Sequence, residues 1–237
     1  MGVIIYNGIS SLDYDIQVEH PPEYTTPERD YLLQSIPGRN GDLVQDNGCY
    51  KNVSRSYDIA IGSYEEEHVT LANRISEWLH SGSGYVYLED SYQPQYYRLA
   101  MYSEGTTISN LYNHAGRSTI NFNCKPQRFL KSGDALINIT NNQTLTNPTD
   151  FIALPLIIIH GSGSGLLTIG SHVVSISAIT NGMVLNSDMQ DAYYLTSNLN
   201  LTITLSNGFP KLEAGINAIS FSGGITSIDI IPKWWTL

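Results

Sequence analysis

Residues 64–80 have the sequence YEEEHVTLANRISEWLH, which carries the helical pattern around which the rest of the chain can be arranged. Its apolar residues recur at i, i+4, i+7 and i+8 and form one stripe: Leu71, Ile75, Trp78 and Leu79. Ser63 stands three residues before Glu66, as in a capping box, and glycines follow the segment. A helix this short is not stable alone in water. We therefore expect the stripe to pack on a β-sheet.

Strand patterns flank the expected helix. SRSYDIAIG (54–62) precedes it and YVYLED (85–90) follows. Two further segments, 96–105 and 117–126, alternate between apolar and polar residues as strands do. We expect these two to form an arm, linked by the polar segment 106–116, that projects beyond the domain.

Turn dipeptides mark a hairpin nearer the N-terminus. Pro37-Gly38 and Asn40-Gly41 are turn signals, and they lie between the short apolar runs 33–36 and 43–45. The sequence predicts that these two runs pair as a β-hairpin.

Composition changes near residue 133, which indicates two domains, 1–133 and 134–237. Residues 1–133 hold 10 Lys and Arg and 16 Asp and Glu, whereas residues 134–237 hold 2 and 6. Fourteen of the 16 tyrosines lie in the first part. The first part is expected to be an α+β domain in which one helix, residues 64–80, packs on a sheet.

The second part has many short apolar strands separated by turn residues, which is typical of a β-sandwich or barrel. Its strands include PLIIIHG, LLTIG, AISFSG and SIDIIP. Residues 161–165, GSGSG, lead into a strand rather than a helix, so they favour a turn over a phosphate-binding loop. The predicted fold class is therefore mainly β.

Charge and cysteine usage exclude several classes of protein. The net charge of −10 disfavours binding to nucleic acid or to anionic lipid. Only 14% of the residues are charged, which favours an oligomer with covered surfaces. Cys49 and Cys124 are expected to be buried, small apolar residues in a reducing compartment. Every apolar run is shorter than the roughly 20 residues of a membrane span.

The sequence contains no pattern that indicates catalysis, a metal site or a cofactor. The six histidines lack the paired spacing of metal ligands. Glu89 and Asp90 are adjacent on a strand and point to opposite faces, so they cannot converge as glycosidase carboxylates. Asp188 and Asp191 are the acidic near-neighbours of the second domain, and no matching constellation accompanies them. We expect a protein that is not an enzyme.

A concentration of tyrosines between residues 85 and 102 has three interpretations: core packing, sugar stacking or a protein interface. The interface is favoured because tyrosine is enriched at interfaces and the region has low charge. The candidate inter-subunit contacts are Tyr96, Tyr97, Tyr102, Leu111, Tyr112 and Phe122.

Several runs, taken in order, resemble the distal tail protein family of long non-contractile-tailed phages. They include SIPGRNGDL (35–43), the helix with its following strands, STINFNCKPQRFLKSG (118–133), LNSDMQDAYY (185–194) and FPKLEAGINAISFSG (209–223). The resemblance covers essentially the whole chain and rests on the order of these runs rather than on one motif.

The resemblance implies a structural hub at the phage tail tip. A homohexameric ring of N-terminal domains would enclose a channel for the genome DNA, and a β-hairpin belt from each subunit would embrace its neighbour. We expect the belt in the arm between Tyr96 and Pro126. Galectin-like C-terminal β-sandwiches would lie outside.

The resemblance also implies partners and a location. The ring would join the major tail tube protein to a tail-associated lysin or tail fibre hub, with receptor-binding proteins docking in some relatives. It would be assembled in the host cytoplasm and reside in the virion. The alternative function is a carbohydrate-binding, lectin-like adhesion module in residues 134–237.

Overall fold

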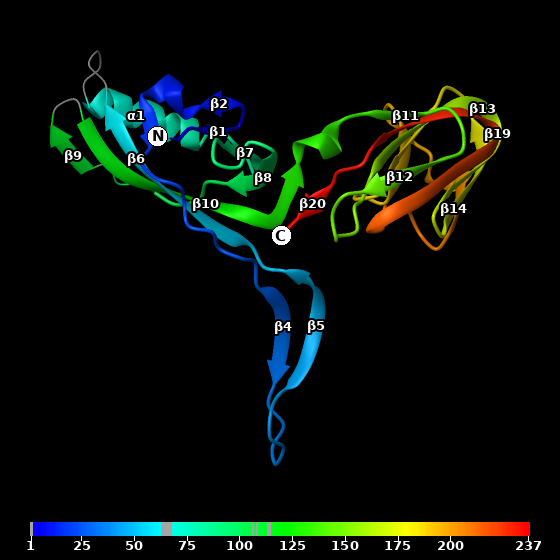
Figure 1. Cartoon of the computed structure of the whole chain (residues 1–237), viewed down its shortest axis with the longest axis horizontal. Coiled ribbons are helices and arrows are strands. Elements are labelled where there is room, and N and C mark those ends of the chain that lie inside the picture. The colour runs from blue at the N-terminus through cyan, green and yellow to red at the C-terminus, as the bar shows by residue number, and fades with distance from the viewer. Residues whose placement is uncertain (1, 63–67, 106, 108, 113–114) are drawn as a thin grey trace. The chain divides into compact units, whose positions relative to one another are not determined.

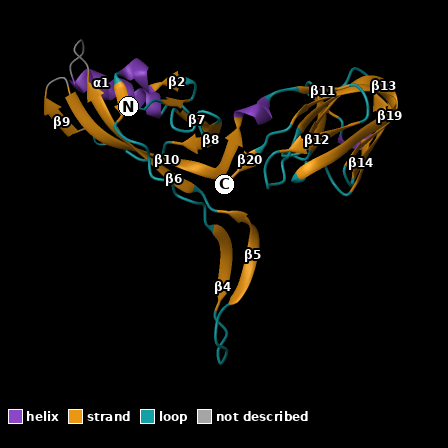
Figure 2. Cartoon of the chain, in the orientation of Figure 1, coloured by secondary structure: helices purple, strands orange, loops and turns teal. Residues whose placement is uncertain are grey.

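The protein consists of two compact units, Met1–Arg128 together with Leu237, and Phe129–Thr236. A computed structural model describes residues 2–62, 68–105, 107, 109–112 and 115–237, and for residues 68, 109–112 and 115 it describes the backbone alone. Strands dominate both units, as Figure 2 shows, so the prediction of a mainly β fold is confirmed.

One antiparallel sheet and one helix organise the first unit. The sheet has the strand order β2-β1-β7-β8-β10-β6-β3, with β9 pairing to β10, and β4 and β5 form a separate two-stranded sheet. The elements, labelled in Figure 1, are β1 (Ile4–Tyr6), β2 (Ile9–Ser10), η1 (Ser11–Tyr14), β3 (Ile16–Val18), β4 (Arg29–Gln34), β5 (Leu43–Tyr50), β6 (Val53–Gly62), α1 (His68–Leu79), β7 (Val86–Asp90), β8 (Tyr96–Met101), β9 (Ser109–Tyr112) and β10 (Ala115–Leu130).

Helix α1 packs on this sheet through the apolar stripe that the sequence predicts. All four side chains of the stripe are at most 3% exposed and belong to the core of the unit. Trp78 donates from its indole nitrogen to the carbonyl of Tyr6 at 3.2 Å and stacks on the ring of Tyr14. The predicted helix is thus confirmed from His68 onward, whereas the predicted capping box at Ser63 lies outside the described residues.

Shortening one stripe residue should weaken the unit by a modest amount. Ile75→Val should cost about 0.5–1.5 kcal/mol of unfolding free energy, because Ile75 is 1% exposed and the lost methyl group leaves a small cavity. Val69 on the same helix is 68% exposed, so Val69→Ala should change the free energy by no more than about 0.5 kcal/mol. Urea unfolding of the two variants gives the comparison. Equal losses would show that the stripe is not the packed face.

The expectation of a projecting arm is wrong. Strand β8 pairs with β7 and β10 pairs with β6, and β8 and β10 are neighbours inside the sheet. Both predicted strands exist, but each also has a partner on its other edge, so neither is free to project. Of the segment that links them, residues 106, 108, 113 and 114 lie outside the described residues, and β9 pairs back onto β10.

The second unit is a two-layered antiparallel sandwich. Its strands belong to one nine-stranded sheet. The elements are η2 (Lys131–Asp134), β11 (Ile137–Ile139), β12 (Gln143–Asn147), β13 (Leu156–Ile169), β14 (His172–Ile179), β15 (Met183–Asn186), β16 (Asp191–Tyr194), β17 (Ser197–Asn198), η3 (Asn200–Thr202), β18 (Ile203–Ser206) and β19 (Gly215–Ile231). The short strand β20 (Trp235–Thr236) follows and is not part of this sheet.

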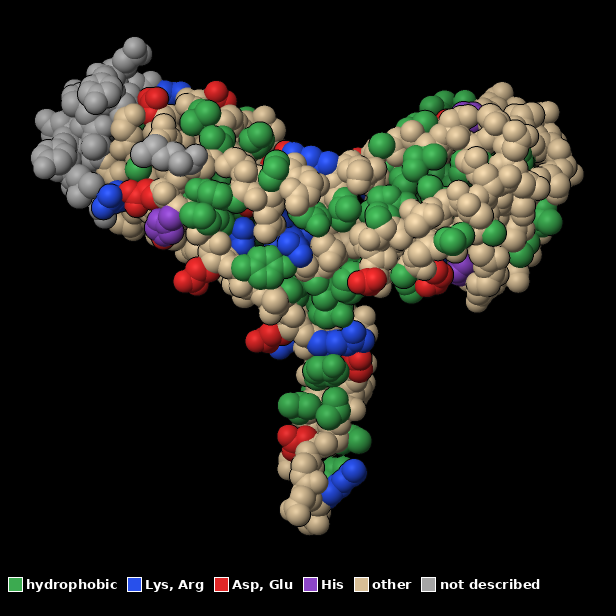
Figure 3. All heavy atoms as spheres, in the orientation of Figure 1, with side chains coloured by type: hydrophobic (Ala, Val, Ile, Leu, Met, Phe, Trp, Pro, Cys, Tyr) green, Lys and Arg blue, Asp and Glu red, His purple; other side chains and the backbone are tan. Residues whose placement is uncertain are grey.

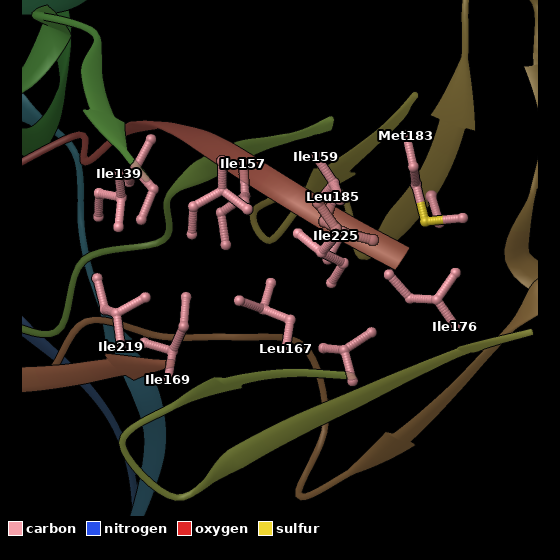
Figure 4. Packing of buried hydrophobic residues seen from close by; sticks show 14 of the residues in the cluster. Ile139, Ile157, Ile159, Leu167, Ile169, Ile176, Met183, Leu185, Ile219 and Ile225 are labelled. Carbon is pink, nitrogen blue, oxygen red and sulfur yellow. The ribbon is translucent and has the colours of Figure 1, made fainter. Parts of the chain in front are cut away.

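Two long strands, β13 and β19, pass from one layer to the other. The first half of β13 pairs with β15 and with the last residues of β19. The second half of β13 pairs with β14 and with the first residues of β19. Most side chains of this core are aliphatic, and those labelled in Figure 4 point into one interior: Ile139, Ile157, Ile159, Leu167, Ile169, Ile176, Met183, Leu185, Ile219 and Ile225.

The expected turn at GSGSG is wrong, because this segment is a bend within β13. The register between β13 and β19 shifts around Gly161 and Gly165. A Cβ on Gly161 would lie 2.0 Å from the carbonyl oxygen of Gly224, and a Cβ on Gly224 would lie 1.8 Å from that of Ser162. The two backbones approach too closely for any side chain. The glycines therefore join the predicted strands PLIIIHG and LLTIG into one strand, and AISFSG and SIDIIP into another.

Candidate functional site

The candidate site is the hairpin formed by β4 and β5, which is a sheet of its own. Leu33 pairs directly with Val44 across the hairpin. Residues 35–42 connect the strands, and Gly38 and Gly41 have φ angles of 78° and 80°, a left-handed conformation that glycine adopts without strain. The predicted hairpin is thus confirmed, with longer strands than the sequence indicated.

The hairpin exposes apolar side chains on both of its faces. Cross-strand partners share a face and successive residues alternate. Leu33 and Val44 therefore lie on one face, and Leu32 and Leu43 on the other. Figure 3 shows hydrophobic side chains along the hairpin. Between 46% and 59% of each large apolar residue is exposed, and none belongs to a buried cluster of the described residues: Tyr31, Leu32, Leu33, Leu43 and Val44.

Such a hairpin is suited to contact with another chain. An isolated two-stranded hairpin is at best marginally stable in water. Contiguous exposed apolar surface and long open strand edges are features of protein interfaces. Covering the hairpin on both faces would bury these side chains and supply partners for the strand edges.

An ion pair holds the strands together at the hairpin base. Arg29 donates to Oδ2 of Asp46 from Nε at 3.0 Å and from Nη2 at 2.8 Å, and to the hydroxyl of Tyr50 at 3.2 Å. The backbone N–H of Gly48 donates to Asp46 at 2.8 Å. The hydrogen bonds from Arg29 and then Gly48 lower the pKa of Asp46. The pair therefore stays charged at neutral pH and sets the geometry of the base.

A buried polar cluster ties the chain that enters the hairpin to the main sheet. Arg55 on β6 donates to the carbonyl of Glu23 at 2.7 Å and lies 3.5 Å from Oδ2 of Asp90. Tyr57 donates to the same carboxylate oxygen at 2.9 Å. Burial raises the pKa of Tyr57, so its hydroxyl remains a donor. The side chains of Arg55 and Asp90 are 4% and 7% exposed, so this cluster is an internal anchor.

Two of the six sequence-predicted contact residues lie inside the subunit. Phe122 is 1% exposed and packs against Tyr6 and Tyr57. Tyr97 is 5% exposed and packs against the ring of Tyr87. Their aromatic surface is already used for packing within the chain. For these two residues the interior position corrects the expectation of a contact surface.

The structure does not bring the other four together as one surface. Tyr96 is half-buried, and the guanidinium of Arg128 lies 5.1 Å from its ring centroid. Tyr102 packs against the core of the first unit. Leu111 and Tyr112 lie in β9, where the side chains are outside the described residues. A role in contact between subunits stays a prediction for these four.

The turn dipeptides predict the hairpin, but they do not indicate that its apolar residues are exposed. The available signal is the run Tyr31-Leu32-Leu33, in which apolar residues follow one another without alternation beside a turn-rich segment. A strand with one buried face alternates, whereas a strand covered on both faces does not. This run therefore predicts a strand that needs cover on both sides.

The hairpin also corrects the expectation for one cysteine. Cys49 is exposed, because it lies on β5 of the hairpin rather than in a core. Cys124 is buried as expected, and burial raises the pKa of its thiol to about 11.

Neither a metal site nor a membrane-spanning helix occurs in the described part of the chain. Among the described residues, no group of three or more histidine, cysteine, aspartate and glutamate side chains is placed to hold a metal ion. The one described α-helix, α1, is too short and too polar to cross a membrane.

The chain was compared with known sequences and structures. No protein-family model and no curated protein sequence matches it. Among solved structures it is similar to the crystal structure of SPP1 Dit (gp 19.1), described as a paradigm of the hub adsorption apparatus in Gram-positive-infecting phages. The TM-score is 0.76 at 15% sequence identity, and the match covers 100% of both chains. Over its whole length, the chain has the fold of SPP1 Dit.

Proposed function

We propose that this protein is a structural hub of a phage tail tip and that it forms a homohexameric ring. The observation that carries the proposal is the hairpin β4–β5, which exposes five large apolar residues that belong to neither buried cluster of the described residues. The full-length fold similarity to SPP1 Dit supports the same conclusion. A surface that fits a different surface on an identical neighbour produces head-to-tail contacts, which close into a ring when the rotation permits.

The ring would have a structural role and would not catalyse a reaction. Residues 1–133 would form it, with β4–β5 as the belt around the neighbouring subunit, and residues 134–237 would be a galectin-like domain on the outside. The genome DNA would pass through the central channel. The net charge of −10 disfavours binding of the DNA to the protein, because like charges repel.

The partners follow from the position of such a hub. The ring would connect the major tail tube protein to a tail-associated lysin or tail fibre hub, and receptor-binding proteins would dock on it. It would be assembled in the host cytoplasm and remain at the tail tip of the virion.

Removing the hairpin should abolish the ring. We expect the wild-type protein to have six times the mass of the 26.2 kDa chain in light scattering. Replacing residues 31–48 by a Gly-Ser-Gly linker should give a monomer, because it removes all five exposed apolar residues. The melting of the core should change little, because those residues lie outside both buried clusters.

A matched control separates this loss from general surface effects. Leu201 in the second unit is fully exposed, so Leu201→Ser removes an apolar side chain without touching the hairpin. This variant should keep the wild-type mass and a six-fold ring in negative-stain electron microscopy. A hairpin-deleted protein that still forms the ring would contradict the proposed belt, and a wild-type protein that is monomeric at every concentration would contradict the ring.

A further inference from the structure

The sheet face opposite α1 has an apolar half on β1, β7 and β8. Tyr87 pairs with Leu99 and Ile5 pairs with Glu89, so these side chains point to the face that does not carry the core. Alternation places Tyr85 and Met101 on that face as well. We call the apolar, at least partly exposed members of this face the tyrosine platform: Ile5, Tyr85, Tyr87, Leu99 and Met101. Glu89 and the buried Tyr97 lie on the same face.

The rest of the same face is polar. The outward residues of β6 and β10 are small or polar and lie in register across the two strands: Ser54, Ser56, Asp58, Thr119, Asn121 and Asn123. The tyrosine platform is therefore a bounded patch rather than a general property of the sheet. Within it, Ile5, Tyr85 and Tyr87 are 36%, 39% and 48% exposed.

We infer that the tyrosine platform of one copy receives the hairpin face of Tyr31, Leu33 and Val44 from the next copy. The inference rests on the proposed ring and names the surface on which its hairpin docks. Each chain carries one hairpin and one platform. Because the two surfaces differ, the contact is head-to-tail, as a ring requires.

Shape and size fit this occupant. A two-stranded ribbon can lie flat on a sheet face at the usual spacing of about 10 Å. The eight residues of β5 span roughly 26 Å, enough to reach across to a neighbouring subunit. The hairpin face offers Tyr31, Leu33 and Val44, each 47–59% exposed, and the platform offers Ile5, Tyr85 and Tyr87, each 36–48% exposed. Contiguous exposed apolar surface of this kind marks protein interfaces.

Charge at the borders of the two surfaces is complementary. Lys125 lies at the platform edge, with its ammonium 5.2 Å from the ring centroid of Tyr85. Asp42 immediately precedes β5 at the far end of the hairpin. Among the described residues, the structure shows no ion pair for either of them. A hairpin that crosses the platform with its far end toward Lys125 would pair the two charges.

Disulfide capture between two different variants tests the contact directly. In a Cys49→Ser background, we would mix one chain carrying Leu33→Cys with another carrying Tyr87→Cys under mild oxidation. A covalent dimer should form in the mixture and in neither variant alone. Ser56→Cys on the polar half replaces Tyr87→Cys as the control and should give no dimer with Leu33→Cys. Equal capture at both positions, or none at Tyr87→Cys, would overturn the inference.

Ring affinity provides a second readout. Tyr87→Lys should weaken association at least tenfold in dilution experiments monitored by light scattering, whereas Ser56→Lys should leave it unchanged. Lys125→Glu should weaken association, and a chain that also carries Asp42→Lys should recover it.

The outcomes separate this inference from the proposed function. If hairpin deletion dissolves the ring while Tyr87→Lys and Lys125→Glu do not, the hairpin docks elsewhere and only this inference falls. If hairpin deletion leaves the ring intact, β4–β5 is not the belt, and the proposed belt and its docking surface are both wrong.

Discussion

Asp90→Ala should destabilise the first unit by about 3–5 kcal/mol, the usual cost of leaving a buried charge without its partner. The lost carboxylate lies 3.5 Å from the buried guanidinium of Arg55 and accepts a hydrogen bond from Tyr57. It also accepts the backbone N–H groups of Tyr92 and Gln93, each at 2.9 Å. The substitution thus leaves one cation and three donors without their acceptor in a region that water barely reaches.

Urea unfolding monitored by tryptophan fluorescence measures this loss, with Asp58→Ala as the matched control. Asp58 lies on β6, as Arg55 does, but its side chain is 48% exposed and its ion pair with His20 spans 3.1 Å. An exposed pair contributes at most about 1 kcal/mol. Removing both buried charges, with Asp90→Leu and Arg55→Met, should cost less than Asp90→Ala alone. If the double variant were the less stable, the cluster would not be behaving as a buried ion pair.

Gly224→Ala should lower the unfolding free energy of the second unit by more than about 4 kcal/mol, which is at the upper end of the effects of single substitutions. The added Cβ would lie 1.8 Å from the carbonyl oxygen of Ser162 and 3.1 Å from that of Ser164. Both obstacles are backbone atoms of β13, so no change of rotamer can relieve the contact. The two long strands must separate at the bend that joins the layers of the sandwich.

Hydrogen exchange of the β13 and β19 amides should report this loss locally, with exchange accelerated around residues 159–167 and 219–225. Gly163→Ala is the control, because a Cβ there meets nothing within 4 Å and only its φ of 81° is unfavourable. That variant should lose about 1–2 kcal/mol, the cost of a left-handed conformation for an ordinary residue. Similar losses of unfolding free energy in both variants would show that the strain of a left-handed backbone, rather than the close approach of the strands, is the reason that glycine is required.

Local sequence patterns predict where the helices and strands of this protein lie better than they predict which elements pack or pair with each other. The stripe on α1 is buried as its spacing indicates, because helical periodicity is a property of neighbouring residues. The strands β8 and β10 also exist where the alternation places them. Their position inside the sheet depends on pairing with β7 and β6, and pairing between distant strands leaves no periodic signal in either one.

The candidate site illustrates the same limit. Turn dipeptides predict the hairpin, but the exposure of its apolar side chains depends on which other described residues pack against them. The six contact residues inferred from aromatic content include Phe122, whose ring fills the core. Residue type cannot distinguish an aromatic side chain that packs inside a subunit from one that contacts a neighbouring subunit.

Four features follow from the amino-acid sequence alone: the mainly β class, the packed face of the helix, the hairpin and a compositional change near residue 133. The first three depend on periodicities or turn residues within short segments, and the last depends on residue counts. Contacts between distant parts of the chain settle three further features: residues 161–165 bend a continuous strand, β8 and β10 are internal to the sheet, and the apolar side chains of β4–β5 are exposed in the described structure. The physical reason is that a glycine, an alternating strand and an apolar run each fit more than one environment, and atoms far away in the sequence select among them.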